Sequence, residues 1–192
     1  MANHFYAMLS RMKNIYRWGL MRNTRQENLS EHSLEVALIA HALAVISNRR
    51  FGNHFDANYV AAAAMLHDTS EIITGDMPTP IKYYNPEIKS AYKQVEAVAQ
   101  ERLINMLPED MQADFMPLYN PDCETARLIK AADKLSALIK CIEELNSGNR
   151  EFLSAEKSTR EAIAALSCPE AEVFMDEFLE SFTLTLDDCT KE

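Results

Sequence analysis

The stretch NLSEHSLEVALIAHALAVI, residues 28–46, decides the fold class of this protein. Asn28 and Glu31 have the spacing of a capping box, in which each side chain accepts from a backbone amide at the start of a helix. The residues that follow are apolar on nearly every side of that helix, which is typical of a helix at the centre of a protein. His32 lies on one of these apolar rows, so its ring must find a polar partner.

Apolar stripes with helical spacing continue along the rest of the chain. They predict helices over residues 57–74, 85–108, 122–146, 151–167 and 170–182, a short helix near 110–118, and a polar tail. The four glycines each fall where a helical pattern stops, as C-terminal caps do; they are Gly19, Gly52, Gly75 and Gly148. Because no repeat or linker interrupts the pattern, we predict one all-α domain.

Composition and charge exclude several classes of protein. The chain has 192 residues, 47% hydrophobic and 25% charged, as in an ordinary globular domain. A net charge of −10 disfavours a nucleic-acid polymer as partner. Residues 1–50, however, carry seven Lys and Arg against three Asp and Glu, and this basic segment suits the binding of one small anion. The longest apolar runs fall short of the ~18 residues that a membrane span needs, and Arg11, Lys13 and Arg17 interrupt any signal peptide. We therefore expect a cytoplasmic protein without a membrane segment.

Two kinds of motif are missing from the sequence. The four cysteines form no CxxC pair, so we expect reduced thiols, with neither a zinc ribbon nor a dithiol redox site. The chain also contains no GxGxxG, GxxxxGK[ST] or GxSxG motif. A bound phosphate must therefore be held by side chains or by a metal ion.

The doublet His67-Asp68, followed by Glu71, is the strongest local signal for chemistry. On a helix over 57–74 these side chains share one face, and that helix supplies no Lys or Arg to balance them. Because an unpaired buried charge costs several kcal/mol, a metal ion is the natural counter-charge. The alternative is a hydrogen-bonded His–Asp pair at the protein surface.

His32 and Asp133 are the other candidate metal ligands. Each has a simpler interpretation when taken alone: His32 as a hydrogen-bonded core residue, and Asp133 as an exposed ion pair with Lys130 three residues earlier. Taken with the doublet, they reproduce the H…HD…D pattern of the HD-domain phosphohydrolases. The chain thus resembles that superfamily.

The resemblance narrows through motifs outside this pattern. The pair Arg17-Trp18, LMRN at residues 20–23, ENLSEHS, MLHDTSEIITGDMPTPIKYYN and KAADKL look like the bacterial HD-domain 5'-deoxynucleotidases of the YfbR type. This resemblance covers essentially the whole chain. It implies an all-α HD-domain bundle over residues 1–192, a homodimer, and removal of the 5' phosphate from deoxyribonucleoside 5'-monophosphates.

The resemblance also implies roles for individual residues. A single divalent transition-metal ion (Co, Mn, Zn or Fe) would be held by His32, His67, Asp68 and Asp133. Arg17 would hold the phosphate and Glu71 would assist the chemistry. The residues implied to contact the substrate are Arg17, Trp18, His32, Asp68, Asp76, Met77, Pro78, Thr79 and Asp133.

The chemistry of these side chains suits metal-assisted phosphomonoester hydrolysis, with Arg17 on the phosphate oxygens and Glu71 orienting or deprotonating the water. Their simpler interpretations are a solvated basic face for Arg17, a core position for Trp18, and a helix stop for GDMPTP. Two other functions stay open. One is an HD hydrolase of nucleoside triphosphates or cyclic dinucleotides, and the other is a non-catalytic HD module that senses a nucleotide.

Overall fold

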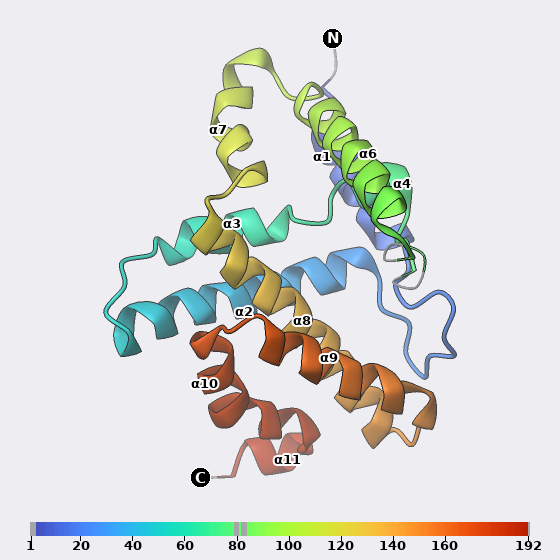
Figure 1. The fold of residues 1–192 in the computed structure, drawn as a ribbon, viewed down its shortest axis with the longest axis vertical. Helices are drawn as coiled ribbons and strands as arrows, with labels where there is room; N and C mark the ends of the chain where they lie inside the picture. Colours follow the sequence, from blue (N-terminus) through green and yellow to red (C-terminus); the bar gives the residue numbers. More distant parts are fainter. Residues whose placement is uncertain (1–2, 79–80, 82–83, 192) are drawn as a thin grey trace.

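A computed structural model describes residues 3–78, 81 and 84–191. Helices make up the regular structure throughout this part of the chain, with only an isolated antiparallel bridge between Tyr16 and Asn28 (Figure 1). The prediction of an all-α fold is confirmed.

Helix α2, Leu29–Arg50, is the central element and packs against α3 (Ala57–Met65), α8 (Cys123–Asn146) and α10 (Pro169–Phe178). The predicted capping box at its start is present: Asn28 accepts from the amide of Glu31, and Glu31 accepts from that of Asn28. Eleven of its 22 residues are buried, so about half of the helix packs within the protein.

The same helix meets the length and hydropathy expected of a membrane span. Its most apolar 18-residue window has a mean hydropathy of 1.4. His41 ends the uninterrupted apolar run in the sequence, but a single polar residue lowers the mean over the window only slightly. However, 56% of that window is buried in the protein. Packing in the core thus accounts for the buried part of this apolar helix, while Leu34, Leu38 and Val45 stay exposed.

The described residues form two hydrophobic cores. The larger one lies between α2, α3, α8 and the helices that follow α8. The smaller one joins α1 (Phe5–Leu9), α6 (Pro86–Ile104) and α7 (Glu109–Tyr119), and its buried members are Phe5, Leu66, Leu103, Leu107 and Tyr119. In Figure 1 the helices of the smaller core lie toward the end of the molecule marked N, and those of the larger core lie toward the end marked C. The other segments among the described residues are η1 Ser10–Asn14, α4 Glu71–Thr74, η2 Arg150–Phe152, α9 Leu153–Ala165, η3 Leu179–Thr183 and α11 Leu186–Cys189.

Several predicted boundaries were wrong. The helix expected over 57–74 ends at Met65 and resumes only at Glu71. Gly19 lies in a turn and caps no helix, whereas Gly52, Gly75 and Gly148 adopt the positive φ that helix ends favour. Helices α1 and η1, before the first predicted helix, and α11, in the predicted polar tail, were not expected.

Candidate metal centre and substrate site

The His67-Asp68 doublet lies on the turn that separates α3 from α4, not on a continuous helix. Two side-chain hydrogen bonds reinforce this turn: Thr69 Oγ1 donates to the Leu66 carbonyl at 2.8 Å, and His67 Nδ1 lies 2.7 Å from the Ala64 carbonyl. The backbone amides of Thr69 and His67 donate to the same two carbonyls. Ala64 belongs to the larger core and Leu66 to the smaller one. The doublet is therefore held at the junction of the two cores.

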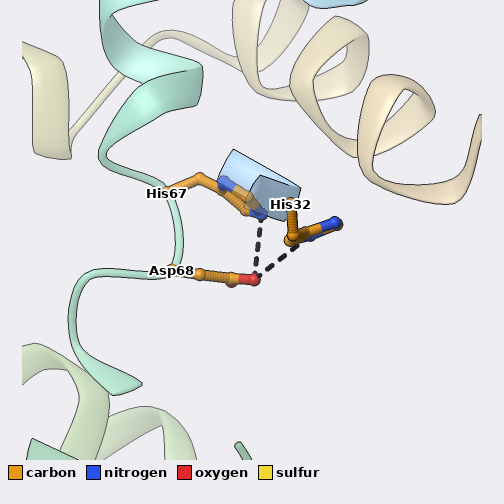
Figure 2. A group of neighbouring side chains, drawn as sticks. All are labelled: His32, His67 and Asp68. Atoms are coloured by element: carbon orange, nitrogen blue, oxygen red, sulfur yellow. Dashed lines mark ion pairs between the residues drawn. The ribbon is translucent and has the colours of Figure 1, made fainter. Parts of the chain in front are cut away.

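His32, from α2, faces the doublet (Figure 2). One ligand atom from each of His32, His67 and Asp68 lies within 4.8 Å of the other two. Asp68 Oδ2 is 3.0 Å from His67 Nε2 and 3.6 Å from His32 Nε2. Two imidazole nitrogens and a carboxylate oxygen are thus directed at one point.

The protonation of His67 can be read from its hydrogen bonds. A carbonyl only accepts, so the Ala64 carbonyl requires a proton on His67 Nδ1, and in the neutral ring the lone pair is then on Nε2. The Nε2 atoms of both His67 and His32 are buried and have no hydrogen-bond partner among the described residues. Imidazole nitrogen and carboxylate oxygen are ligands of Zn, Fe, Co and Mn. The donor set therefore fits a divalent transition-metal ion.

Asp133, from α8, lies beside His32, outside the group formed by His32, His67 and Asp68. Its Oδ1 is 3.5 Å from His32 Nε2, and only 9% of the residue is exposed. The ion pair with Lys130 is also present, at 2.7 Å from Oδ2, and Lys134 lies 3.5 Å from the same oxygen. The two interpretations of Asp133 are thus compatible, because one oxygen faces the histidine while the other faces the lysines.

Charge at this centre favours ionised carboxylates. Burial alone would raise the pKa of Asp68, but the His67 and His32 rings outweigh it and hold that pKa well below its usual range. Burial likewise acts on Asp133, whose pKa is lowered well below its usual range by His32, Lys130 and Lys134. Both groups therefore present negative charge to a cation at neutral pH.

Arg17 and Trp18 lie on a loop that borders the centre. Arg17 Nη1 is 3.4 Å from Asp68 Oδ2, and the Arg17 side chain is only 12% exposed. Trp18 has a φ of 59°, a left-handed conformation that costs a bulky residue free energy. Its ring packs at 5.3 Å against that of Phe152. Arg17 is therefore not part of a solvated basic face.

Glu27 belongs to this site, but the sequence indicated no role for it beyond its place in the segment ENLSEHS. Its Oε2 accepts from Arg17 Nε at 3.1 Å and from Trp18 Nε1 at 3.0 Å. A carboxylate ten residues from Arg17 in a loop carries no periodic signal, so only the folded structure shows this contact.

The end of this loop is anchored on α8 by a buried carboxylate. Glu144, 1% exposed, accepts from the amide and hydroxyl of Thr24, from Asn149 and from Lys140. Lys140 also donates to the Arg25 carbonyl at 2.5 Å. The segment that carries Arg17 is thus fixed to the helix that carries Asp133.

The remaining predicted residues follow the doublet. Glu71 begins α4 and is 5% exposed, and its amide donates to the Asp68 carbonyl at 2.9 Å. Asp76, Met77 and Pro78 follow Gly75 and are partly buried. Burial would lower the pKa of Arg17, but the charges of Asp133, Glu27, Asp68 and, least, Asp76 outweigh it and raise that pKa. Thr79 lies outside the described residues.

Solved structures with similar folds identify the fold of this chain. An HD-domain phosphohydrolase from Listeria innocua aligns with a TM-score of 0.81 at 24% identity, covering 95% of this chain and 90% of that one. The HD phosphohydrolase DatZ of cyanophage S-2L, bound to dA and one catalytic Zn²⁺ ion, aligns with a TM-score of 0.66 at 19% identity, covering 91% and 96%. The fold is that of the HD-domain phosphohydrolases.

Sequence comparison narrows this class. The chain belongs to the 5'-deoxynucleotidase YfbR-like family, whose model matches residues 4–182. It is 50% identical to the 5'-deoxynucleotidase VV1113 of Vibrio vulnificus (strain YJ016), over 97% of each chain. It is 51% identical to a 5'-deoxynucleotidase of Yersinia pestis (strain Pestoides F), over 97% of this chain and 96% of that one.

Proposed function

We propose that this chain is a metal-dependent 5'-deoxynucleotidase, which hydrolyses deoxyribonucleoside 5'-monophosphates to deoxyribonucleosides and phosphate. The observation that carries this proposal is the pair of buried Nε2 atoms of His32 and His67, both near Asp68, with the Arg17 guanidinium 3.4 Å from that carboxylate. Candidate ligands for a metal ion thus lie next to a guanidinium that can donate to a phosphate group. Metal-assisted hydrolysis of a phosphate ester requires both. The curated relatives at 50 and 51% identity carry the same activity in their names.

The proposed metal ligands are His32, His67, Asp68 and Asp133. A bound divalent ion supplies Lewis-acid chemistry here, drawing charge from the phosphate oxygens and increasing the acidity of water. Mixed nitrogen and oxygen ligands suit Co, Mn, Zn or Fe. The Zn²⁺ in DatZ supports an ion of this group.

Arg17 is placed to orient the phosphate. Its guanidinium is always charged and offers several donors, so it stabilises the negative charge that increases in the transition state. The contact with Glu27 holds Nε while Nη1 points to the centre. His32, Asp68 and Asp133 would line the other side of the phosphate.

Glu71 is proposed to deprotonate or orient the attacking water. Its carboxylate is buried next to the turn that carries Asp68. Trp18 would cover the sugar or base, and Asp76 would accept from a sugar hydroxyl. Met77, Pro78 and Thr79 would complete the substrate loop.

Metal depletion and a nucleotide panel test this function. Purified protein treated with a chelator should lose phosphate release from deoxyribonucleoside 5'-monophosphates, and single additions of Co²⁺, Mn²⁺, Zn²⁺ or Fe²⁺ should restore it. Ribonucleotides, triphosphates and cyclic dinucleotides serve as competing substrates. Faster cleavage of triphosphates, or binding without turnover, would contradict the assignment.

We also propose a cytoplasmic homodimer that binds no nucleic-acid polymer and no membrane. An exposed apolar stripe on α2 supports the dimer: Leu34 is 57% exposed, Leu38 65% and Val45 39%. All four cysteines are free thiols, which supports a reducing compartment. Light scattering of the wild type against Leu38→Glu tests this, since a dimer formed through the stripe should become a monomer.

A further inference from the structure

The outer side of the His32 ring carries a chain of two hydrogen bonds. His32 Nδ1 lies 3.0 Å from the hydroxyl of Ser136, and that hydroxyl donates to Glu35 Oε2 at 2.6 Å. His32 and Ser136 are both fully buried, whereas Glu35 is half-buried at the wall of a cleft of about 280 Å³. None of the motifs in the sequence marks Glu35 or Ser136 as functional.

The order of protons along this chain follows from the groups themselves. An ionised carboxylate only accepts, so the single hydroxyl proton of Ser136 is directed at Glu35. The lone pairs of that hydroxyl remain for His32 Nδ1, which must carry a proton to donate to them. In the neutral ring His32 Nε2 then carries the lone pair, facing Asp68 and Asp133.

We propose that Glu35 and Ser136 are positioning residues for the metal centre: they fix the tautomer and the orientation of His32 so that its Nε2 is ready to bind the ion. This inference rests on the metal-dependent function proposed above. Partners of this kind raise the basicity of a ligating histidine, and their loss typically lowers metal affinity by about 10- to 100-fold.

The two histidines are supported in different ways. His67 Nδ1 is held by a backbone carbonyl, that of Ala64, which no side-chain substitution removes. His32 Nδ1 depends on the side chain of Ser136, from the helix that also carries Asp133 one turn earlier. The hydrogen bond between His32 and Ser136 thus links α2 to α8, the two helices that carry the proposed ligands His32 and Asp133. Of the two imidazoles, only that of His32 can lose its Nδ1 partner through a side-chain substitution.

Metal affinity of the chelator-stripped protein tests the proposal, with Zn²⁺ or Mn²⁺ in competition with a chromogenic chelator. Ser136→Ala should weaken binding by about 10- to 100-fold. Glu35→Gln should weaken it less, because the amide oxygen still accepts from Ser136 but lacks the charge. In a Ser136→Ala background, Glu35→Gln should have no further effect.

Glu35→Gln in the Ser136→Ala background shows whether Glu35 acts on His32 through Ser136 or only through its negative charge. Glu143→Gln is the matched control, since Glu143 is an exposed carboxylate that lines the same cleft. It should leave the dissociation constant unchanged. Equal weakening by Glu143→Gln and Glu35→Gln would overturn the proposal.

A second readout uses the metal-free protein. Nitrogen-15 NMR of its histidines should show a protonated Nδ1 on His32 in the wild type, and a shift toward Nε2 protonation in Ser136→Ala. Circular dichroism and urea midpoints report whether that variant folds, and if it does not, Glu35→Gln decides. Unchanged affinity and tautomer in the folded variants would refute the positioning role, whereas a wild type that binds no ion would refute the proposed function itself.

Discussion

The indole nitrogen of Trp18 donates to Glu27 at 3.0 Å, through the same carboxylate oxygen that accepts from Arg17 Nε. One acidic side chain therefore orients two neighbouring residues of the proposed substrate site. It also offsets the conformational cost of the left-handed backbone at Trp18.

Replacing Glu27 by Ala should reduce kcat/KM for deoxyribonucleoside monophosphates by about 10- to 100-fold, as expected for loss of hydrogen bonds to a charged group. Metal affinity should stay within about twofold of the wild type, because Glu27 is not a proposed ligand. Steady-state kinetics and chelator competition measure the two quantities. Glu151→Gln is the control, since it breaks the pair with the largely exposed Arg22 on the same loop and should change little.

Arg17→Lys should lower kcat by about 100-fold although it keeps the charge. A lysine ammonium cannot at once contact Glu27 and direct further donors to the phosphate. If Arg17 contributes mainly in the transition state, KM changes less than kcat. A lysine variant with wild-type kcat would contradict this role.

Glu71→Gln should lower kcat by about 100- to 10,000-fold, the usual contribution of a general base. The amide keeps the size of the side chain but cannot take a proton. Metal content, measured by elemental analysis, should remain one ion per chain. A loss of metal together with activity would instead identify Glu71 as part of the ligand set.

The buried Glu144 should make stability depend on pH. Burial would raise its pKa, but Lys140, Asn149 and Thr24 outweigh this and lower the pKa from 4.5 to about 2. Its stabilising contribution, about 3 kcal/mol, is therefore complete above pH 4.5 and declines as the pH falls toward 2. Urea unfolding of wild type and Glu144→Gln should differ most near pH 7 and converge in acid. A pH-independent difference would refute the assignment.

Sequence patterns predicted α2 and α8 well because both helices combine long apolar stripes with side-chain caps, at Asn28 and Asp122. They failed at residues 66–70, where no Gly or Pro marks the end of α3. The Thr69 hydroxyl satisfies a backbone carbonyl there, which a periodic pattern cannot reveal.

A residue of the candidate site could be predicted where its type is unusual for its position in the sequence pattern. His32 stood out as a ring on an apolar helix, and the doublet as charge without a counter-charge. Glu27 had no such mark, because its partners are brought to it only by the folding of the loop. Helix α1 was missed for a similar reason: Phe5 is buried by contacts with residues about 100 positions away.

Leu66 packs in the smaller core, and this has a consequence for inactivation by heat. That core buries five residues and brings together α1, α6 and α7, so it should open at a lower temperature than the larger one. Once it opens, the imidazole of His67, one residue along, loses its fixed place. On warming, catalysis should then be lost while most of the helical circular dichroism signal persists. Substitutions that improve the packing around Phe5 and Leu103 should therefore raise the temperature at which activity is lost.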